Sequence, residues 1–307
     1  MKFGAQIGVY RTTWDKIEQV VRICDKGVWN SIWFADHYLP PPPRREEEHL
    51  NAHEGFTIAA AVAGITDKVE IGHMVLGNTY RHPALAAKMA TTVDQISHGR
   101  FTFSIGAAWF QREHEAYGWD FPAMKERQDR LEEACELLRA LFHGQGPVTY
   151  QGRFYQLDEA PLAPGCYARP IPIMVGGTGP KRTLRTLAKF GDVFNLDGWA
   201  GAPMTRKYLD HKWDIVQQHC EEVGRDPSEI RKTLLMPTLL SEDSNACEAM
   251  IKARRLGEGS AIGSKGYIVD RIGEMIDAGV DEIMFGGILT NTPEAYLEYE
   301  AEVLSQF

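Results

Sequence analysis

Two neighbouring side chains, Asp36 and His37, are the best candidates for acid–base chemistry in this chain. They close the apolar run SIWFADH. An imidazole exchanges a proton near neutral pH, so a histidine at the end of a buried strand can act as a general acid or base. Two other roles stay open: His37 could bond loop carbonyls, and Asp36 could only orient it or cap the loop.

A site for an anion is the second candidate. In VGGTGPKRT, residues 175–183, an apolar run ends in glycines and a helical pattern begins. Free N–H groups and the dipole at a helix N-terminus attract a phosphate, and glycine lets it approach closely. Lys181 or Arg182 would add charge. The alternative is an ordinary tight turn between strand and helix.

Other catalytic motifs are missing or weak. The chain has no GxGxxG, GxSxG or CxxC motif, and GSAIGSKG at residues 259–266 lacks the Lys-Ser/Thr order of a phosphate loop. His49 and His53 stand four apart among glutamates, as metal ligands on one helical face would. Their segment is charged and follows four prolines, so we expect a solvated loop and no metal site.

Composition points to one large domain, residues 1–307, that acts on small molecules. The formal net charge is −9 and the basic residues are scattered, which argues against a nucleic-acid or anionic membrane surface. Five cysteines, an odd number, predict reduced thiols. No stretch of 18 apolar residues occurs, and the N-terminal run lacks the pattern of a signal peptide. We therefore expect a cytoplasmic protein.

Eight short apolar runs alternate with eight segments of helical periodicity, which predicts an α/β fold, the (β/α)8 TIM barrel. Near-continuous apolar runs such as IPIMV are typical of parallel strands covered on both faces. The predicted strands are residues 3–8, 31–37, 69–76, 100–107, 171–177, 192–197, 232–240 and 282–288. The predicted helices are residues 14–26, 56–66, 84–96, 123–142, 181–189, 204–223, 267–278 and 293–305.

Two insertions do not fit a minimal barrel. Residues 39–54, after the second strand, carry four consecutive prolines that favour an extended wall or lid on the active-site face. Residues 144–170, before the fifth strand, contain VTYQGRFYQL, which predicts a hairpin turning at Gln151 and Gly152. Because it follows a helix, we expect the base of this hairpin at the end of the barrel opposite the active site.

The chain resembles the luciferase-like monooxygenase superfamily, and more closely its branch that uses the deazaflavin coenzyme F420. The resemblance covers nearly the whole chain and is carried by an ordered series of motifs, and it implies the same barrel. These motifs are WFADH, GNTYRHPALAAKMATTVDQISHGR, IGAAW followed by REHEAYG, KERQDRLEEACELL, and PIPIMVGGTGPKRTLRTLAKFGD.

The resemblance also implies roles for individual residues. A non-proline cis peptide would lie behind the cofactor ring near Met74 and Val75, and Asp36 and His37 would stand beside the redox face of the ring. The ring and ribityl chain would be lined by Gly77, Asn78, Gly106, Ala107 and Ala108, and the phosphate would be held by Gly176, Gly177 and Thr178.

The implied activity is that of an F420-dependent oxidoreductase. It transfers a hydride between the deazaflavin and a small organic substrate, and His37 exchanges the proton. The chain departs from the sugar-phosphate dehydrogenases of this branch, because Trp109 stands where they carry an acid. This leaves the proton to His37 or to a group that the sequence does not identify, and it leaves the substrate open. The resemblance also implies a homodimer.

Two alternatives remain at this point. FMN in place of F420 would make the chain a two-component monooxygenase that receives reduced flavin from a separate reductase. A protein that binds the cofactor without catalysis is also compatible with the fold, because binding loops can be retained after a catalytic group is lost.

Overall fold

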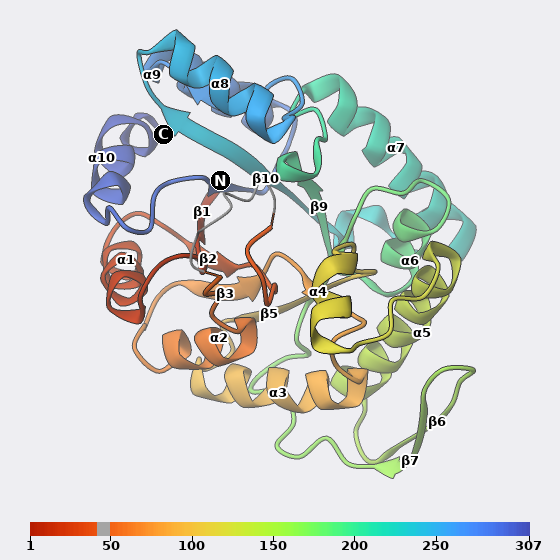
Figure 1. Cartoon of the computed structure of the whole chain (residues 1–307). Coiled ribbons are helices and arrows are strands. Elements are labelled where there is room, and N and C mark those ends of the chain that lie inside the picture. Colours follow the sequence, from red (N-terminus) through yellow and green to blue (C-terminus); the bar gives the residue numbers. More distant parts are fainter. Residues whose placement is uncertain (42–49) are drawn as a thin grey trace.

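A computed structural model describes residues 1–41 and 50–307. Within these residues, parallel strands form a closed barrel surrounded by helices (Figure 1). The barrel closes because β1 pairs with both β2 and β12, and β10 pairs with both β9 and β12. This confirms the predicted (β/α)8 TIM barrel. Its strands are β1 (Lys2–Ile7), β2 (Ser31–Phe34), β3 (Glu70–His73), continued by β4 (Leu76–Gly77), β5 (Phe101–Gly106), β8 (Ile173–Gly176), β9 (Val193–Asp197), β10 (Arg231–Leu240) and β12 (Glu282–Gly286).

The predicted helices are present with ends that differ by a few residues. They are α1 (Trp14–Lys26), α2 (Gly55–Ala63), α3 (Pro83–Ile96), α5 (Met124–His143), α6 (Thr183–Phe190), α7 (Arg206–Val223), α9 (Lys265–Asp277) and α10 (Glu294–Glu302). Elements that the sequence analysis missed are the helices α4 (Gln111–Tyr117) and α8 (Ser244–Arg254), the short strand β11 (Ala261–Gly263), and the 3-10 turns η1 (Gly198–Ala200), η2 (Pro227–Glu229) and η3 (Leu304–Gln306). The glycine-rich segment 259–266, which lacks the order of a phosphate loop, contains the strand β11.

Apolar packing explains this arrangement. Every residue of β5 and β12 is buried, as expected for strands covered on both faces. Helix α1 buries Ile17, Val20, Val21 and Cys24, a stripe at helical spacing that faces the strands. A separate small cluster is made mostly of strand side chains and fills the barrel; it contains Trp33, Met74, Met174, Val193, Leu235 and Met284.

A polar cluster lies at the amino ends of the strands, far from the carboxyl-end loops. Lys2 Nζ lies 2.5 Å from Glu70 Oε1, and Arg231 lies 3.1 Å from Glu70 Oε2 and 3.6 Å from Glu282 Oε2. The Ser31 hydroxyl also donates to Glu282. Burial raises the pKa of Glu282, and the charge of Arg231 counteracts part of that rise. This end of the barrel stabilises the fold.

The insertion before β8 forms the predicted hairpin, with β6 (Val148–Gln151) and β7 (Gln156–Ala160) outside the ring of helices (Figure 1). Glu133 of α5 accepts hydrogen bonds from the backbone N–H groups of Phe154 and Tyr155. Tyr155 in turn meets Asn78, which follows β4. Although we expected the hairpin base at the opposite end, its tip reaches the carboxyl-end side.

The proline-rich insertion lies partly outside the described residues, which exclude 42–49. His49, one of the two histidines considered as metal ligands, also falls there. His53 is described, and its Nε2 lies 3.3 Å from the carbonyl of Thr12. None of the helices in the described ranges is long and apolar enough to cross a membrane.

Candidate active site

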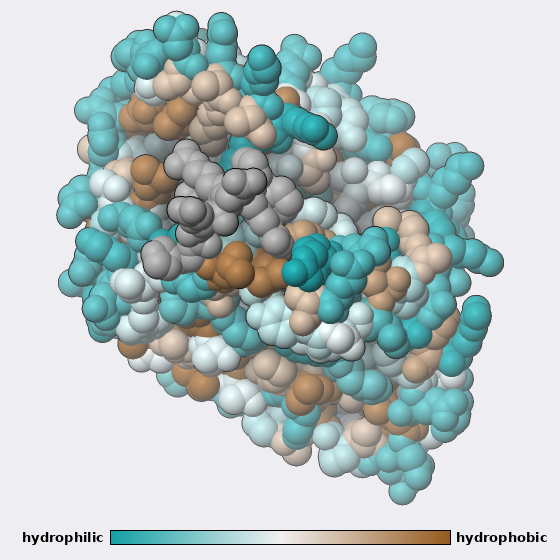
Figure 2. Space-filling model, viewed as in Figure 1, coloured by the Kyte–Doolittle hydropathy of each residue, from teal (hydrophilic) through white to brown (hydrophobic). Residues whose placement is uncertain are grey.

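The residues proposed for the site lie at the carboxyl ends of four consecutive barrel strands, β2, β3/β4, β5 and β8. Asp36 and His37 follow β2, Gly77 ends β4, Gly106 ends β5 and Gly176 ends β8. Apolar side chains gather near the middle of the face that carries α4 (Figure 2). The barrel thus brings together segments that are far apart in sequence, at the end where barrel enzymes bind ligands.

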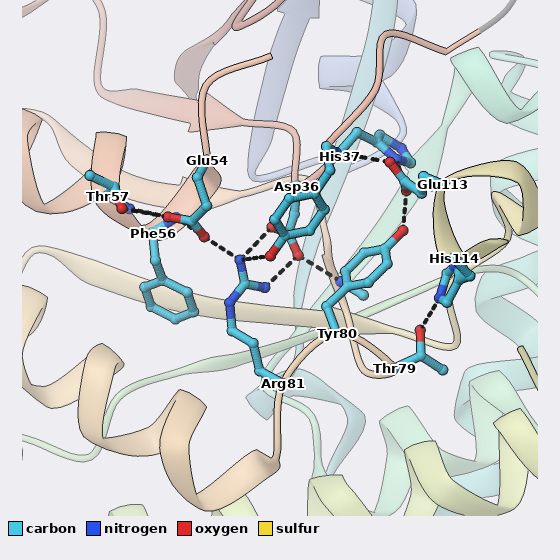
Figure 3. Close-up of polar contacts among 12 residues, drawn as sticks. Asp36, His37, Glu54, Phe56, Thr57, Thr79, Tyr80, Arg81, Glu113 and His114 are labelled. Carbon is cyan, nitrogen blue, oxygen red and sulfur yellow. Dashed lines mark hydrogen bonds and ion pairs between the residues drawn. The ribbon is translucent and has the colours of Figure 1, made fainter. Parts of the chain in front are cut away.

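His37 is held by a buried carboxylate, Glu113 of α4 (Figure 3). Its Nδ1 lies 2.7 Å from Glu113 Oε1, and the Glu113 side chain is fully buried. The edge of the imidazole also meets the Trp109 ring, with centroids 5.4 Å apart. Within the described residues, Nε2 of His37 makes no hydrogen bond, so this nitrogen is available to a ligand.

Glu113 has further donors that hold it as an anion. Its Oε2 accepts from the backbone N–H groups of Tyr38, at 2.8 Å, and Leu39, at 3.2 Å, and its Oε1 accepts from the Tyr80 hydroxyl. Burial raises the pKa of Glu113, but the hydrogen bond and charge of His37, together with these donors, lower it overall. A carboxylate beside Nδ1 stabilises the doubly protonated imidazole and fixes the orientation of the ring.

Asp36 makes a different set of contacts. Arg81 binds both of its carboxylate oxygens, at 2.8 and 2.9 Å, and the backbone N–H of Gly77 donates to Oδ2 at 3.0 Å. Arg81 also pairs with Glu54 (Figure 3). Since its oxygens are occupied by the ion pair with Arg81 and by the N–H of Gly77 at the end of β4, Asp36 positions the segment that carries Gly77 and Asn78. Its catalytic role stays a prediction.

Val75 fills the space between two of the predicted glycines. A Cβ atom on Gly106 would lie 2.9 Å from Val75 Cγ2, and one on Gly176 would lie 2.6 Å from the same atom. The Met74–Val75 peptide bond is cis, as the resemblance implies. Glycine at these two positions lets the ends of β5 and β8 approach the Met74 and Val75 segment closely.

Asn78 and Ala108 are held from outside the barrel. Asn78 is buried and its Nδ2 donates to the Tyr155 hydroxyl at 3.2 Å, while its Oδ1 is buried without a partner in the described residues. Arg127 of α5 donates to the carbonyls of Ala107 and Ala108, and Ala108 has a φ of 59°. A ligand that donates a hydrogen bond to Asn78 would satisfy this orphaned oxygen.

The glycine segment after β8 has the geometry of an anion site. Gly177 has a φ of 113°, a conformation that favours glycine. The N-terminus of α6 carries no side-chain cap. The N–H groups of Thr178 and Gly179 donate no hydrogen bond within the described residues. Of the two basic residues expected to help, Lys181 is exposed and Arg182 pairs with Asp129.

Asp197 is a further acid, partly buried at the end of β9. Burial raises its pKa to about 6, although the N–H groups of Trp199 and Ala200 oppose this shift. Its Oδ1 accepts a hydrogen bond from the Trp199 N–H at 2.8 Å, and within the described residues no side chain pairs with it. Asp197 caps η1, and the sequence analysis did not consider it.

The most important residue that the sequence analysis missed is Glu113. It lies four residues after Trp109, where an acid had been sought. A signal was available, because Phe110, Glu113, His114 and Tyr117 share one face of a short helix next to the IGAAW strand end. A glutamate on the apolar face of a helix is a candidate for a buried, paired carboxylate.

Comparison with known proteins gives the family. The family model for luciferase-like monooxygenases matches residues 1–260. The F420-dependent glucose-6-phosphate dehydrogenase of Amycolatopsis mediterranei is 29% identical over 226 residues, which are 72% of this chain and 63% of that protein. The chain therefore spans less than two thirds of the length of this relative.

Two further proteins widen the comparison. An FMNH2-dependent dimethylsulfone monooxygenase of Pseudomonas putida is 33% identical over 138 residues, 45% of this chain and 37% of that protein. The solved structure of an F420-dependent secondary alcohol dehydrogenase, in complex with an F420–acetone adduct, covers 99% of this chain and 98% of its own, with a TM-score of 0.80 and 19% identity. This last likeness concerns the fold. From the extent of the family match, the chain belongs to the luciferase-like monooxygenase family.

Proposed function

We propose that this protein is an F420-dependent oxidoreductase that transfers a hydride between the deazaflavin and a small organic substrate. The observation that carries the proposal is the pair formed by His37 and Glu113 at the carboxyl end of the barrel. It supplies a proton carrier whose Nε2 is available, next to the segments expected to line the cofactor. The F420-dependent relative supports the choice of cofactor.

The described residues fit a flavin-type cofactor with a phosphate tail. Glycine at positions 106 and 176 leaves room for the Val75 side chain, so the Met74–Val75 segment lies against these strand ends, where we expect the ring. The unpartnered Asn78 Oδ1 offers a hydrogen-bond acceptor to a ligand, and the N–H groups of Thr178 and Gly179 offer donors to a phosphate. These residues would hold the ring and the phosphate of such a cofactor.

When bound, the deazaflavin supplies a carbon that accepts or donates a hydride. His37 handles the proton that must leave or join the substrate in the same reaction: its Nε2 takes the proton when the substrate is oxidised and returns it in the reverse direction. Glu113 stabilises the imidazolium formed in the first case. The rigid placement of His37 by α4 and the β2 loop orients this nitrogen without further movement.

Three exposed apolar side chains lie in loops at the carboxyl end of the barrel. Leu289, Leu50 and Trp109 are 67%, 59% and 57% exposed, the highest values among the large apolar residues described, and each lies in a loop that follows a barrel strand. Exposed apolar surface at the carboxyl end of a barrel is typical of a binding site. We therefore propose a substrate with an apolar part.

A titration tests the proposal. The purified protein is mixed with F420 and, separately, with FMN, while the fluorescence of each cofactor is followed. The proposal predicts tight quenching of F420 and F420-dependent oxidation or reduction in a panel of alcohols, aldehydes and ketones with apolar groups. Binding of FMN alone would contradict it.

The similarity to an FMNH2-dependent monooxygenase favours one alternative, a two-component monooxygenase with a separate reductase. Oxygen consumption with chemically reduced FMN and the same substrates distinguishes the two enzymes, since a deazaflavin hardly reacts with oxygen. Tight binding of either cofactor with no turnover would favour a non-catalytic binding protein. The homodimer stays a prediction that sedimentation analysis can check.

A further inference from the structure

Trp109 presents a flat apolar surface beside the imidazole of His37. The residue is 57% exposed, and its indole stacks on the Phe110 ring, with centroids 5.1 Å apart and an angle of 18° between the planes. Phe110 is only 6% exposed and directly precedes α4, so the fold fixes the position of this partner. Trp109 is therefore an exposed aromatic ring that is supported by a buried one.

Two centroid distances locate His37 relative to this stack. The imidazole centroid lies 5.4 Å from that of Trp109 and 5.8 Å from that of Phe110, and the imidazole plane is nearly perpendicular to both rings. A ring over the outer face of Trp109 would lie much farther from Phe110 than from Trp109. His37 therefore lies beside the stack, and neither ring covers the outer face of Trp109. No other ring of the described residues contacts Trp109.

The backbone on both sides of Trp109 is held by hydrogen bonds. Arg127 donates to the carbonyls of Ala107 and Ala108, and the N–H of Gln111 donates to the Trp109 carbonyl at 3.1 Å. Since Ala107 and Ala108 are expected to line the cofactor, Trp109 directly follows that segment of the chain. A surface that is fixed before a ligand binds loses little conformational entropy on binding. The outer face of Trp109 is therefore a preformed apolar wall next to the proton carrier.

We propose that Trp109 selects a substrate in which a planar aromatic group is bonded directly to the reacting carbon, as in an aryl aldehyde, an aryl ketone or the corresponding alcohol. The inference rests on the proposed function, because it names the substrate class of that same site. The planar group extends the stack of Trp109 and Phe110, and offset stacking of aromatic rings is favourable beyond the apolar area that it buries. Because His37 lies beside the stack, an oxygen on the reacting carbon reaches its Nε2.

The conversion of such an alcohol balances with the groups already named. The C–H bond of the reacting carbon breaks and its hydride goes to the deazaflavin, the O–H proton goes to Nε2 of His37, and a C=O bond forms. The reverse reaction reduces the aldehyde or ketone. Trp109 takes part in no bond change; it contacts the substrate and determines specificity.

The test compares flat and saturated compounds of the same size. With F420, kcat/KM is measured for benzyl alcohol and cyclohexylmethanol; without cofactor, calorimetry measures the binding of the unreactive benzamide and cyclohexanecarboxamide. The variants are W109L, which removes the aromatic face, and W109F, which keeps one. The control is Y167L, which removes an exposed aromatic ring that contacts His98. The thermal midpoint of each variant shows whether it is folded.

We expect W109L to lower the ratio of kcat/KM for the aromatic alcohol to that for the saturated one about three- to tenfold, and to lower the corresponding ratio of amide affinities by a similar factor. Comparing ratios between proteins removes the difference in intrinsic reactivity of the two alcohols, because that difference is the same for every variant. W109F should lose less than W109L, and Y167L should match the wild type. The affinity for F420 should match the wild type in all variants.

Unchanged ratios in W109L would overturn the inference, and so would a loss of F420 affinity with unchanged ratios, which would show that Trp109 contacts the cofactor instead of the substrate. A wild-type protein that converts other alcohols with F420, but neither converts benzyl alcohol nor binds benzamide, also overturns the inference and leaves the proposed function intact. If no alcohol is converted with F420 while W109L still lowers the ratio of amide affinities, the proposed function fails and the aromatic subsite at Trp109 is supported.

Discussion

The Glu113 carboxylate lies 2.7 Å from Nδ1 of His37 and joins α4 to the loop after β2. Two backbone N–H groups, of Tyr38 and Leu39, donate to the second oxygen of the same carboxylate. One side chain thus fixes both the imidazole and the path of the chain that follows it.

Replacing His37 by alanine should lower kcat/KM by about 10²- to 10⁴-fold, because the general acid–base group is lost. The dissociation constant of the cofactor should stay within about twofold, since catalysis by proton transfer adds little to ground-state binding. Steady-state kinetics and fluorescence titration measure the two quantities. His211→Ala, at an exposed position of α7, is the control. Equal activity in mutant and wild type would remove His37 from the mechanism.

Glu113→Gln should lower kcat by about 10- to 100-fold, because the carboxylate that orients the imidazole through Nδ1 and stabilises the imidazolium formed during turnover is lost. The matched control is Glu115→Gln, an exposed position on the same helix. A variant with the kcat of the wild type would show that Glu113 acts only through folding.

The same variant has a predicted effect on stability. The pKa of Glu113 is lowered in the folded protein, so its contribution is present above the ordinary glutamate pKa and is lost as the pH falls through the folded value. Below about pH 4.5, the wild type should therefore lose stability more steeply than Glu113→Gln. Urea unfolding between pH 7 and 3 measures the difference, and parallel curves for the two proteins would contradict the predicted linkage.

Gly176→Ala should weaken cofactor binding and destabilise the fold by about 1–3 kcal/mol, because the new Cβ would lie 2.6 Å from Val75 Cγ2. Adding Val75→Ala should recover part of the loss of stability. Gly146→Ala, where nothing lies within 4 Å of the new Cβ, is the control. Thermal unfolding and cofactor titration are the measurements, and a harmless Gly176→Ala would show that the strand ends can separate.

Arg231→Met should destabilise the protein by about 3 kcal/mol with little change in KM, because it leaves Glu282 buried without its cation at the amino end of the barrel. The double variant Arg231→Met with Glu282→Gln should recover much of that loss. Chemical denaturation measures both. If the double variant is no more stable than the single one, the pairing with Glu282 does not account for the effect.

The barrel could be predicted from sequence because runs such as IPIMV and SIWF are apolar throughout, and strands covered on both faces require this pattern. The positions of Asp36, His37 and Gly106 at strand ends followed from the same runs. Helix α4 was missed because its seven residues make only two turns, too short for their shared face to stand out from the flanking loop. The ion pair between Asp36 and Arg81 joins two loops, and pattern within one segment cannot reveal such a contact.

The burial of Glu113 and Lys212 could not be predicted from the sequence either. Both are charged, and charged residues are usually placed at the surface when only composition is considered. Glu113 is fully buried and Lys212 is only 8% exposed, because tertiary structure brings each to a polar partner: His37 in one case and the Thr178 carbonyl in the other. The chemistry of the site therefore depends on contacts between segments, which appear only in the folded chain.

The hairpin β6–β7 contacts the candidate site from outside the barrel, so changes in the hairpin can alter the position of Asn78. It is anchored on α5 through Glu133 and lies outside the ring of helices, yet Tyr155 at its tip holds the amide of Asn78. Changes of length or sequence within the hairpin strands would leave the barrel ladder untouched. Exchanging this hairpin between related barrels would thus change the support of Asn78 without changing any barrel strand.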